Sequence, residues 1–321
     1  MSKGAKIWLI VAASLILIGG IIFVGVMTML KWDFAKLSTN PYETNEYEMD
    51  EAFKAISVDI DTADITFISS ENSKCSVVCY EQKNLKHSVT VKDDTLVIET
   101  VDTRKWYEHI GITFDTPKIT VAIPEGEYGA LSVRSSTGDV EISKDFKFES
   151  MDLSTSTGDV KNAASAAEAI KIKTSTGNIG IEGIAAGSLD LSVSTGRVNV
   201  SGVACEGDVS VVVSTGKAYL VDVACQNLSS SGNTGDISLK QVVAEERFSI
   251  ERSTGDVKFE GCDAAEIFVE ADTGDVKGSL LTDKVFITQT DTGRVDVPKS
   301  ITGGRCEITT NTGNIQITIR P

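Results

Sequence analysis

A three-residue phrase, Ser-Thr-Gly or a close variant, returns ten times between residue 136 and the end of the chain. The intervals between its glycines are 19 or 20 residues throughout. The repeat glycines are Gly138, Gly158, Gly177, Gly196, Gly216, Gly235, Gly255, Gly274, Gly293 and Gly313. So regular a period indicates a repeat architecture in which each repeat packs mainly on its neighbours.

Apolar residues recur at fixed distances from each glycine, which is counted here as position zero. Positions −7, −5 and +2 are mostly Leu, Ile, Val or Phe, and they alternate with polar residues. This alternation indicates two short, half-buried strands per repeat. Rungs of 19–20 residues stacked about 4.8 Å apart predict an all-β fold, a right-handed single-stranded parallel β-solenoid of about ten rungs. Only the alanine-rich segment 163–170 leaves room for a helix.

A threonine precedes the glycine in all ten repeats, and a stacked threonine column invites an ice-binding interpretation. Position −1 has the same parity as −3, −5 and −7, so a regular strand predicts that these threonines point inward and bond the backbone at the corner. The glycine is expected to supply a positive φ or a tight bend. The threonines are Thr137, Thr157, Thr176, Thr195, Thr215, Thr234, Thr254, Thr273, Thr292 and Thr312.

Positions −2 and +1 are expected to face solvent, and they carry mainly Ser, Asp and Asn. Asp272, Asp275 and Asp291 are the candidates for a Ca²⁺ site, because carboxylate oxygens suit a hard cation. Their spacing matches no calcium-repeat consensus, and turn chemistry explains the same residue types. The sequence therefore predicts no metal site, cofactor or catalytic residue along the repeats.

Residues 7–30 contain no charge and would span about 36 Å as a helix, enough to cross a bilayer. The stretch is longer than the apolar region of a cleaved signal peptide and ends without a small-x-small site. It therefore predicts an uncleaved signal-anchor of a single-pass membrane protein. Residues 1–6 are then expected in the cytoplasm and the bulk of the chain outside the cell.

Residues 31–50 are predicted to form a juxtamembrane stalk, with Trp32, Phe34 and Tyr42 at the lipid interface and a mobile acidic stretch from 43 to 51.

Residues 51–130 are predicted to form a β-rich head, and residues 131–321 the solenoid. In the head, Ile56, Val58 and Ile60 alternate with polar residues before Ala63, which takes the place of a repeat glycine. This predicts a degenerate first rung that shares one sheet system with the repeats. Residues 89–98 read as a hairpin.

The segment 101–117 contains Trp106, Tyr107, His109 and Phe114 and is the most aromatic stretch outside the apolar helix. It is interpreted either as a binding loop or as a lid over the open end of the β-core.

The chain carries 30 Lys and Arg against 46 Asp and Glu, a formal net charge of −16. This balance argues against nucleic acid as a partner, which would need a basic stripe. The six cysteines and two histidines show no metal-site spacing. Cys205 and Cys225 are expected on neighbouring rungs, either as two free core thiols or as a disulfide.

Three features carry a resemblance to a known family: the Phe53-x-x-Ile56-x-Val58 start, the strand from Ile119 to Pro124, and the repeated Ser-Thr-Gly-Asp-Val unit. Over residues 50–321 the chain resembles the putative-adhesin β-strand-repeat family, a bacterial domain of unknown function found in membrane-anchored proteins. The resemblance implies a single-stranded β-helix and supplies no catalytic motif. Some relatives are accessory proteins of envelope-stress systems, which implies a regulatory role as an alternative.

We expect a non-enzymatic, membrane-anchored cell-envelope protein whose β-solenoid serves adhesion or interaction with a protein or envelope polymer. One alternative is an accessory sensor or regulator of an envelope-stress response. A polysaccharide-active β-helix enzyme is a weaker alternative, because the acidic residues recur at turns instead of pairing in a cleft. The chain also stops directly after the predicted strand 315–319, so that strand is expected to form an open edge through which copies self-associate.

Overall fold

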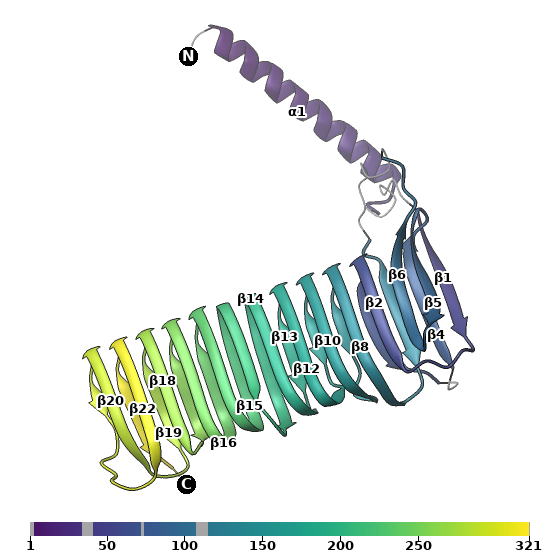
Figure 1. Cartoon of the computed structure of the whole chain (residues 1–321). Helices are drawn as coiled ribbons and strands as arrows, with labels where there is room; N and C mark the ends of the chain where they lie inside the picture. The colour runs from purple at the N-terminus through teal and green to yellow at the C-terminus, as the bar shows by residue number, and fades with distance from the viewer. Residues whose placement is uncertain (1–2, 34–40, 72–73, 107–114, 321) are drawn as a thin grey trace.

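The computed structural model of the chain describes residues 3–33, 41–71, 74–106 and 115–320. Within these ranges the protein has one helix and 23 strands, which join into a single continuous sheet (Figure 1). The sheet winds into a β-solenoid, which confirms the predicted all-β fold with an N-terminal apolar helix.

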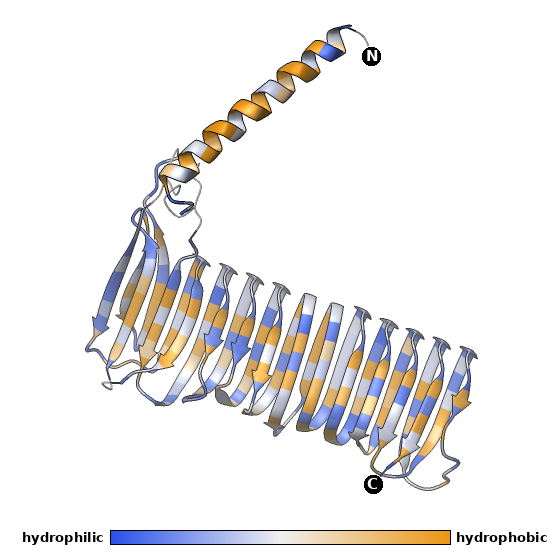
Figure 2. Ribbon diagram, turned by 180° about the vertical axis from the view of Figure 1, so that it is seen from behind, coloured by the Kyte–Doolittle hydropathy of each residue, from blue (hydrophilic) through white to orange (hydrophobic). Residues whose placement is uncertain are grey.

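The helix, α1 (Lys3–Met29), stands clear of the sheet, and its surface is predominantly hydrophobic (Figure 2). An 18-residue window within it has a mean hydropathy of 2.8 and is not covered by any other part of the protein. The helix is therefore long and apolar enough to cross a membrane, a property that it shares with signal sequences.

The head contains the first seven strands, which extend the solenoid as two walls. In one wall β4 pairs antiparallel with both β1 and β7, and in the other β5 pairs antiparallel with β6. Strands β6 and β7 then pair in parallel with β2 and β3, so both walls run directly into the rungs. The bounds are β1 (Tyr42–Met49), β2 (Ala55–Thr62), β3 (Asp64–Ser69), β4 (Cys75–Gln82), β5 (Leu85–Lys92), β6 (Thr95–Asp102) and β7 (Lys118–Ile123).

The predicted acidic stalk is wrong for residues 42–49, which form β1. Asn45, Tyr47 and Met49 are half-buried, while Glu46 and Glu48 between them face solvent. Tyr42 belongs to the head, where its ring stacks on Tyr80 at 4.9 Å between centroids, and its position at a lipid interface stays a prediction. The sequence interpretation followed the acidic composition of this segment and overlooked that its residues alternate with a period of two, as they do on the two faces of a strand.

The repeats stack in parallel and in register, so that equivalent positions of successive rungs lie over one another. Positions −7, −5 and +2 are buried as predicted, except in the outermost rung. The strands are β8 (Gly126–Thr137), β9 (Val140–Ile142), β10 (Phe146–Thr157), β11 (Val160–Asn162), β12 (Ser165–Thr176), β13 (Ile179–Glu182), β14 (Ala185–Cys205), β15 (Val209–Thr234), β16 (Ile237–Thr254), β17 (Val257–Cys262), β18 (Glu266–Thr273), β19 (Val276–Leu280), β20 (Lys284–Thr292), β21 (Val295–Asp296), β22 (Gly304–Thr312) and β23 (Ile315–Ile319). Strand β12 occupies most of the alanine-rich segment where a helix was allowed.

The degenerate first rung is confirmed. Strands β2 and β3 pair in parallel with β8 and β9, and Thr62 lies opposite Thr137. The Ala63 amide donates to the Thr137 carbonyl at 3.0 Å, as the repeat glycines do to the threonine of the following rung. The head and the repeats therefore form one sheet system.

The rungs at the C-terminal end do not follow the order of the sequence. Strand β22 lies between β18 and β20, and β23 pairs with both β19 and β21. The last repeat is thus inserted inside the stack, and the repeat before it forms the outer end. The predicted edge strand, β23, pairs with β19 along its length and also with β21 at Ile315 and Gln316, so the prediction of an open edge is wrong at those two residues. Strand β22 of the same repeat is paired on both sides.

The edge of the stack belongs instead to β20 and β21. Its residues 285–290 carry no charge, and Ile287 and Val295 are exposed. Val295 is 42% exposed, whereas the other nine residues at position +2 are buried. The solenoid therefore ends in an uncapped rung with part of its core in contact with solvent.

Candidate functional site

The threonine side chains of the Ser-Thr-Gly corners face solvent. All ten residues at position −1 are exposed, so the predicted inward orientation is wrong. Each strand keeps its alternation only as far as −3, and the chain then bends so that −2, −1 and +1 all point outward, as Ser175, Thr176 and Asn178 do. Parity failed because it assumed a regular strand up to the glycine.

The role expected of the threonine at −1 belongs to the residue at −3, which is buried in most rungs. Where position −3 is Ser or Thr, its hydroxyl donates to a carbonyl at the corner. Thr174, for example, lies within hydrogen-bond distance of the Gly158 carbonyl (3.2 Å) and the Thr176 carbonyl (3.3 Å). The carbonyls of Thr137, Thr157 and Thr176 also accept a backbone amide of the preceding rung, so the hydroxyls that reach them add a second hydrogen bond at the corner.

The glycine column is confirmed as a conformational requirement. Nine of the ten repeat glycines have φ between +124° and +158°. A Cβ at any of the ten would lie 1.6–2.2 Å from a backbone carbonyl oxygen of the adjacent rung. The close approach of successive corners therefore excludes every side chain at these ten glycines.

The aspartates at position +1 accept hydrogen bonds from backbone amides. Asp139, Asp159 and Asp256 each accept the amide of the +1 residue in the next rung, at 2.7–2.8 Å. Asp275 accepts the Asn314 amide at 2.7 Å and pairs with Lys277, and these two contacts lower the pKa of its carboxyl. The carboxylates thus act as caps for corner amides.

The three calcium candidates do not converge on one site. Asp272 accepts a hydrogen bond from the Asn311 side chain, and Asp275 is occupied as described. Asp291 lies in the outermost rung, separated from the rung of Asp272 and Asp275 by the inserted β22. Among the residues that the structure describes, these aspartates form no group of three with metal-ligand spacing.

The sequence analysis argued against ice binding because strand parity predicted inward threonines, and the observed outward orientation removes that argument. What stands against that activity is the neighbouring column, because charged residues such as Asp159, Arg197 and Lys217 lie two residues from the threonines. The threonine column is one residue wide and is bordered by these charges, so it does not form an extended uncharged face.

A polar groove of about 680 Å³ lies along the variable turns. It is lined by stacked residues of successive rungs that bond in pairs: Asn227 to Asp208 at 2.9 Å, and Arg247 to Glu266 at 2.9 Å. The Arg247 guanidinium also lies 4.9 Å from the ring centre of Phe268. The groove offers hydrogen-bond donors and acceptors at rung spacing, which suits an extended polar ligand.

The aromatic segment 101–117 is described only in part. Trp106 is 79% exposed, while Tyr107, His109 and Phe114 lie outside the described residues. The interpretation of this segment as a binding loop or a lid stays a prediction.

All six cysteines are buried and free. Cys205 and Cys225 lie in equivalent positions of adjacent rungs, where Ala204 pairs with Ala224. Burial raises the pKa of the Cys225 thiol to about 12, so this thiol is protonated and unreactive at neutral pH.

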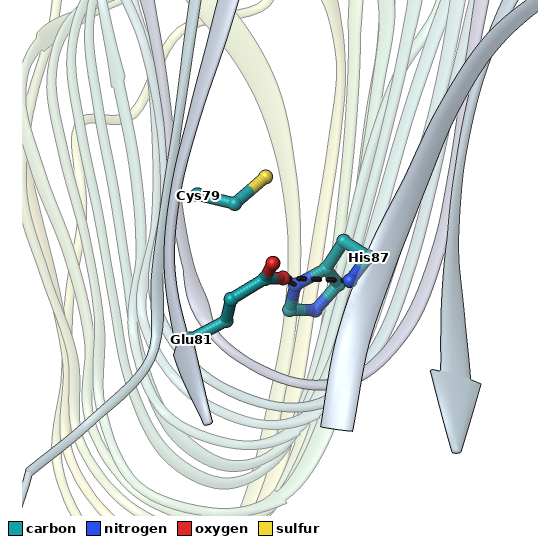
Figure 3. Close-up of side chains that lie close together, drawn as sticks. All are labelled: Cys79, Glu81 and His87. Atoms are coloured by element: carbon teal, nitrogen blue, oxygen red, sulfur yellow. Dashed lines mark hydrogen bonds and ion pairs between the residues drawn. The ribbon is translucent and has the colours of Figure 1, made fainter. Parts of the chain in front are cut away.

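An unexpected group of polar side chains lies inside the head, between its two walls (Figure 3). Cys79 and Glu81 extend from β4 and His87 from β5, and one ligand atom of each lies within 4.8 Å of the other two. A Glu81 carboxylate oxygen lies 2.6 Å from both the backbone amide and Nδ1 of His87. Asn45 donates to the other carboxylate oxygen at 2.7 Å.

The sequence held a signal for this group that was missed. Cys75, Val77, Cys79 and Glu81 occupy the same face of one alternating strand, so the carboxylate falls at an inward position. His87 occupies the inward face of the next strand in the same way. A search by Cys/His spacing overlooked the group because Glu81 supplies one of its three donors.

A second buried polar pair interrupts the solenoid core. Arg252 is 3% exposed and donates to the Ser230 hydroxyl at 2.7 Å, while its Nε has no hydrogen-bond partner. Gly232 makes room for the guanidinium, because a Cβ there would lie 2.0 Å from Arg252 Nη1. Burial lowers the pKa of this guanidinium, and no carboxylate of the described residues lies within ion-pair distance.

A comparison with protein families finds two matches to the profile of one family, described as Toastrack DUF4097, over residues 53–214 and 204–321. Together the matches cover the head from β2 onward and the whole solenoid, which confirms the resemblance found in the sequence. No curated protein matches the chain.

Three similar solved structures come from bacteria. A putative adhesin from Bacteroides fragilis is 17% identical with a TM-score of 0.42, over 87% of this chain and 97% of its own. A putative adhesin from Parabacteroides merdae is 13% identical with a TM-score of 0.49, over 75% and 97%. A putative lipid binding protein from Parabacteroides distasonis is 15% identical with a TM-score of 0.45, over 88% and 98%. At these values the likenesses carry no argument about function.

Proposed function

The chain belongs to the Toastrack DUF4097 family, and on that premise we propose that it is a non-enzymatic, membrane-anchored protein of the cell envelope. Its β-solenoid serves as a rigid scaffold for adhesion or for interaction with a protein or an envelope polymer. The observation that carries this proposal is the polar groove along the variable turns, which presents paired polar side chains at the spacing of the rungs.

The apolar helix supports the anchoring part of the proposal. The side chains of its most apolar 18 residues are not covered by the rest of the protein, and this exposure would be unfavourable in water. Insertion of α1 into a bilayer removes that cost, with the N-terminus in the cytoplasm and the solenoid outside the cell.

The groove supports the interaction part. Arg247 is held in place by Glu266 and by the ring of Phe268, so it is ordered before a ligand arrives. A preorganised Arg loses little conformational entropy on binding, which favours affinity. We therefore place a polar, extended ligand such as an envelope glycan or a peptide strand across the rungs of β15, β16 and β18.

Proteoliposomes that carry the full chain test this proposal through co-sedimentation with isolated cell-envelope fragments. We expect the wild type to sediment with the fragments and the Arg247→Glu variant to bind at least about tenfold more weakly, as expected for loss of about 1.4 kcal/mol at a central contact.

A matched control is Lys240→Glu. Lys240 is an exposed cation on the same strand, and it pairs with Glu260 of the next rung outside the groove, as Arg247 pairs with Glu266. Equal losses for both variants would show that general charge, and not the groove, determines binding. Absence of binding by the wild type to envelope fragments would reject the interaction proposal.

Self-association is a second candidate role, and the exposed end rung favours it. The uncharged residues 285–290 and the exposed Val295 are typical of an edge that pairs with another strand. We propose that two copies join through this end. Sedimentation velocity of the detergent-solubilised chain should show a dimer that Val295→Lys abolishes. Val243→Lys, also at a 42% exposed valine but in the middle of the stack, should leave the dimer intact.

A further inference from the structure

The group formed by Cys79, Glu81 and His87 contains three different metal-binding functions in one place. A thiol, a carboxylate and an imidazole each contribute an atom within 4.8 Å of the other two. Tetrahedral coordination with bonds of about 2.0–2.3 Å places donor atoms roughly 3.3–3.8 Å apart. Side-chain rotations that move the three donor atoms by about an ångström are enough to reach that spacing.

The burial of this group makes a bound cation favourable. Glu81 is 0% exposed and His87 3% exposed, and Cys79 is also fully buried. A carboxylate removed from water requires a positive partner, because its desolvation is costly. The His87 imidazole contacts Glu81 at 2.6 Å, whereas the neighbouring Lys86 pairs with Glu43.

We propose that Cys79, Glu81 and His87 form a binding site for a divalent transition-metal ion of the zinc class. The mixed sulfur, nitrogen and oxygen donors favour such an ion over Ca²⁺ or Mg²⁺, which prefer oxygen ligands alone. Binding replaces the thiol proton of Cys79 with the metal and releases that proton to solvent. Three protein ligands leave one coordination position for water or another small donor.

The surroundings of the site orient its ligands. Asn45 of β1 donates to Glu81 at 2.7 Å, and the Tyr47 hydroxyl donates to the His87 backbone carbonyl at 3.1 Å. Partners of this kind fix the position of metal ligands, and their removal typically lowers metal affinity about 10- to 100-fold. The Asn45→Ala variant is therefore expected to bind the metal with about 10- to 100-fold lower affinity than the wild type.

The site connects the two walls of the head. Strands β4 and β5 share only the pair Gln82 and Leu85, although a short turn joins them. A metal held by Cys79 and Glu81 on one strand and His87 on the other would tie the walls together beyond that turn. Metal binding is therefore expected to raise the unfolding temperature of the head.

The test uses the full chain without an affinity tag, purified in detergent, stripped with a chelator and titrated with Co²⁺ and with Zn²⁺. We expect one ion per chain, a thiolate-to-cobalt charge-transfer band, displacement of Co²⁺ by Zn²⁺, and a higher unfolding temperature with metal. The wild-type spectrum alone can overturn the proposal: absence of the band at saturating Co²⁺ contradicts a site that contains Cys79.

The Cys79→Ser variant should lose the band, while Cys75→Ser should retain it. Cys75 is a matched control, because it is a buried, free cysteine on the same strand and the same face. Circular dichroism checks that both variants are folded. Retention of the band in folded Cys79→Ser, or equal loss in both folded variants, would contradict the assignment of the ligands.

Discussion

Replacement of one repeat glycine by alanine tests how tightly the corners pack. At Gly216 a Cβ would lie 1.6 Å from the Gly196 carbonyl oxygen, whereas real Cβ atoms essentially never approach within 3.0 Å. The two rungs must therefore separate locally by about 1.4 Å, which lengthens hydrogen bonds of about 2.9 Å beyond their useful range. Loss of two or three of these bonds, at about 1 kcal/mol each, adds to about 1–2 kcal/mol for the positive φ. We expect Gly216→Ala to cost about 3–5 kcal/mol.

The matched variant is Gly202→Ala, which separates backbone strain from collision. Gly202 has φ of +62°, but a Cβ there meets no atom closer than 3.7 Å. It should cost about 1 kcal/mol, from the left-handed conformation alone. Urea denaturation of the full chain in detergent, followed by far-ultraviolet circular dichroism, compares the midpoints, and hydrogen exchange shows whether the loss centres on the rungs around residue 216. Equal midpoints for the two variants would refute the steric explanation of the glycine column.

Three further changes test other parts of the fold by the same denaturation assay. Thr176→Lys should change stability by no more than about 0.5 kcal/mol, because this side chain faces solvent. Thr174→Lys, two residues earlier in the same rung, should cost at least about 3 kcal/mol because it buries an unpaired charge. Similar effects of the two variants would contradict the outward orientation of the corner. The double variant Ser230→Ile with Arg252→Thr restores the residue types that other rungs carry and should stabilise the protein by about 1–4 kcal/mol, and a loss of stability would show that the buried pair is favourable. Asp275→Asn should destabilise the protein at pH 7, with a difference that disappears as the pH falls below the ordinary carboxyl value of 3.8 and through the lowered pKa of the folded state; a difference that is constant between pH 7 and pH 2 would contradict the role of the charge.

The repeat period and the inward apolar positions were predictable because each rung must bury the same face. The alignment of Ala63 with the repeat glycines was predictable from the same alternation, and Ala63 is buried and makes the corner hydrogen bond to Thr137 without the positive φ of the repeat glycines. Where the chain departs from a regular strand, parity loses its meaning, and Thr176 is therefore exposed although Thr174 is buried.

The order of the last rungs could not be predicted from the repeat. Every rung presents the same columns to both neighbours, so β22 fits between β18 and β20 as well as it would outside β20. The residues of a repeat determine how two rungs pack on each other, but they do not determine the spatial order of the rungs along the solenoid. The group of Cys79, Glu81 and His87 was hidden for a related reason, because Glu81 and His87 meet only when the two walls of the head close on one another.

The central claim is that a membrane-anchored solenoid is displayed outside the cell with its Ser-Thr-Gly corners facing solvent. All six native cysteines are buried, so a Thr176→Cys variant introduces a single accessible thiol. A membrane-impermeant maleimide applied to intact cells should label this variant and leave both the wild type and the buried Thr174→Cys variant unlabelled. Labelling of Thr176→Cys only after the cells are lysed would contradict the display of the solenoid outside the membrane, and a lack of labelling in the folded, lysed sample would contradict the outward corner.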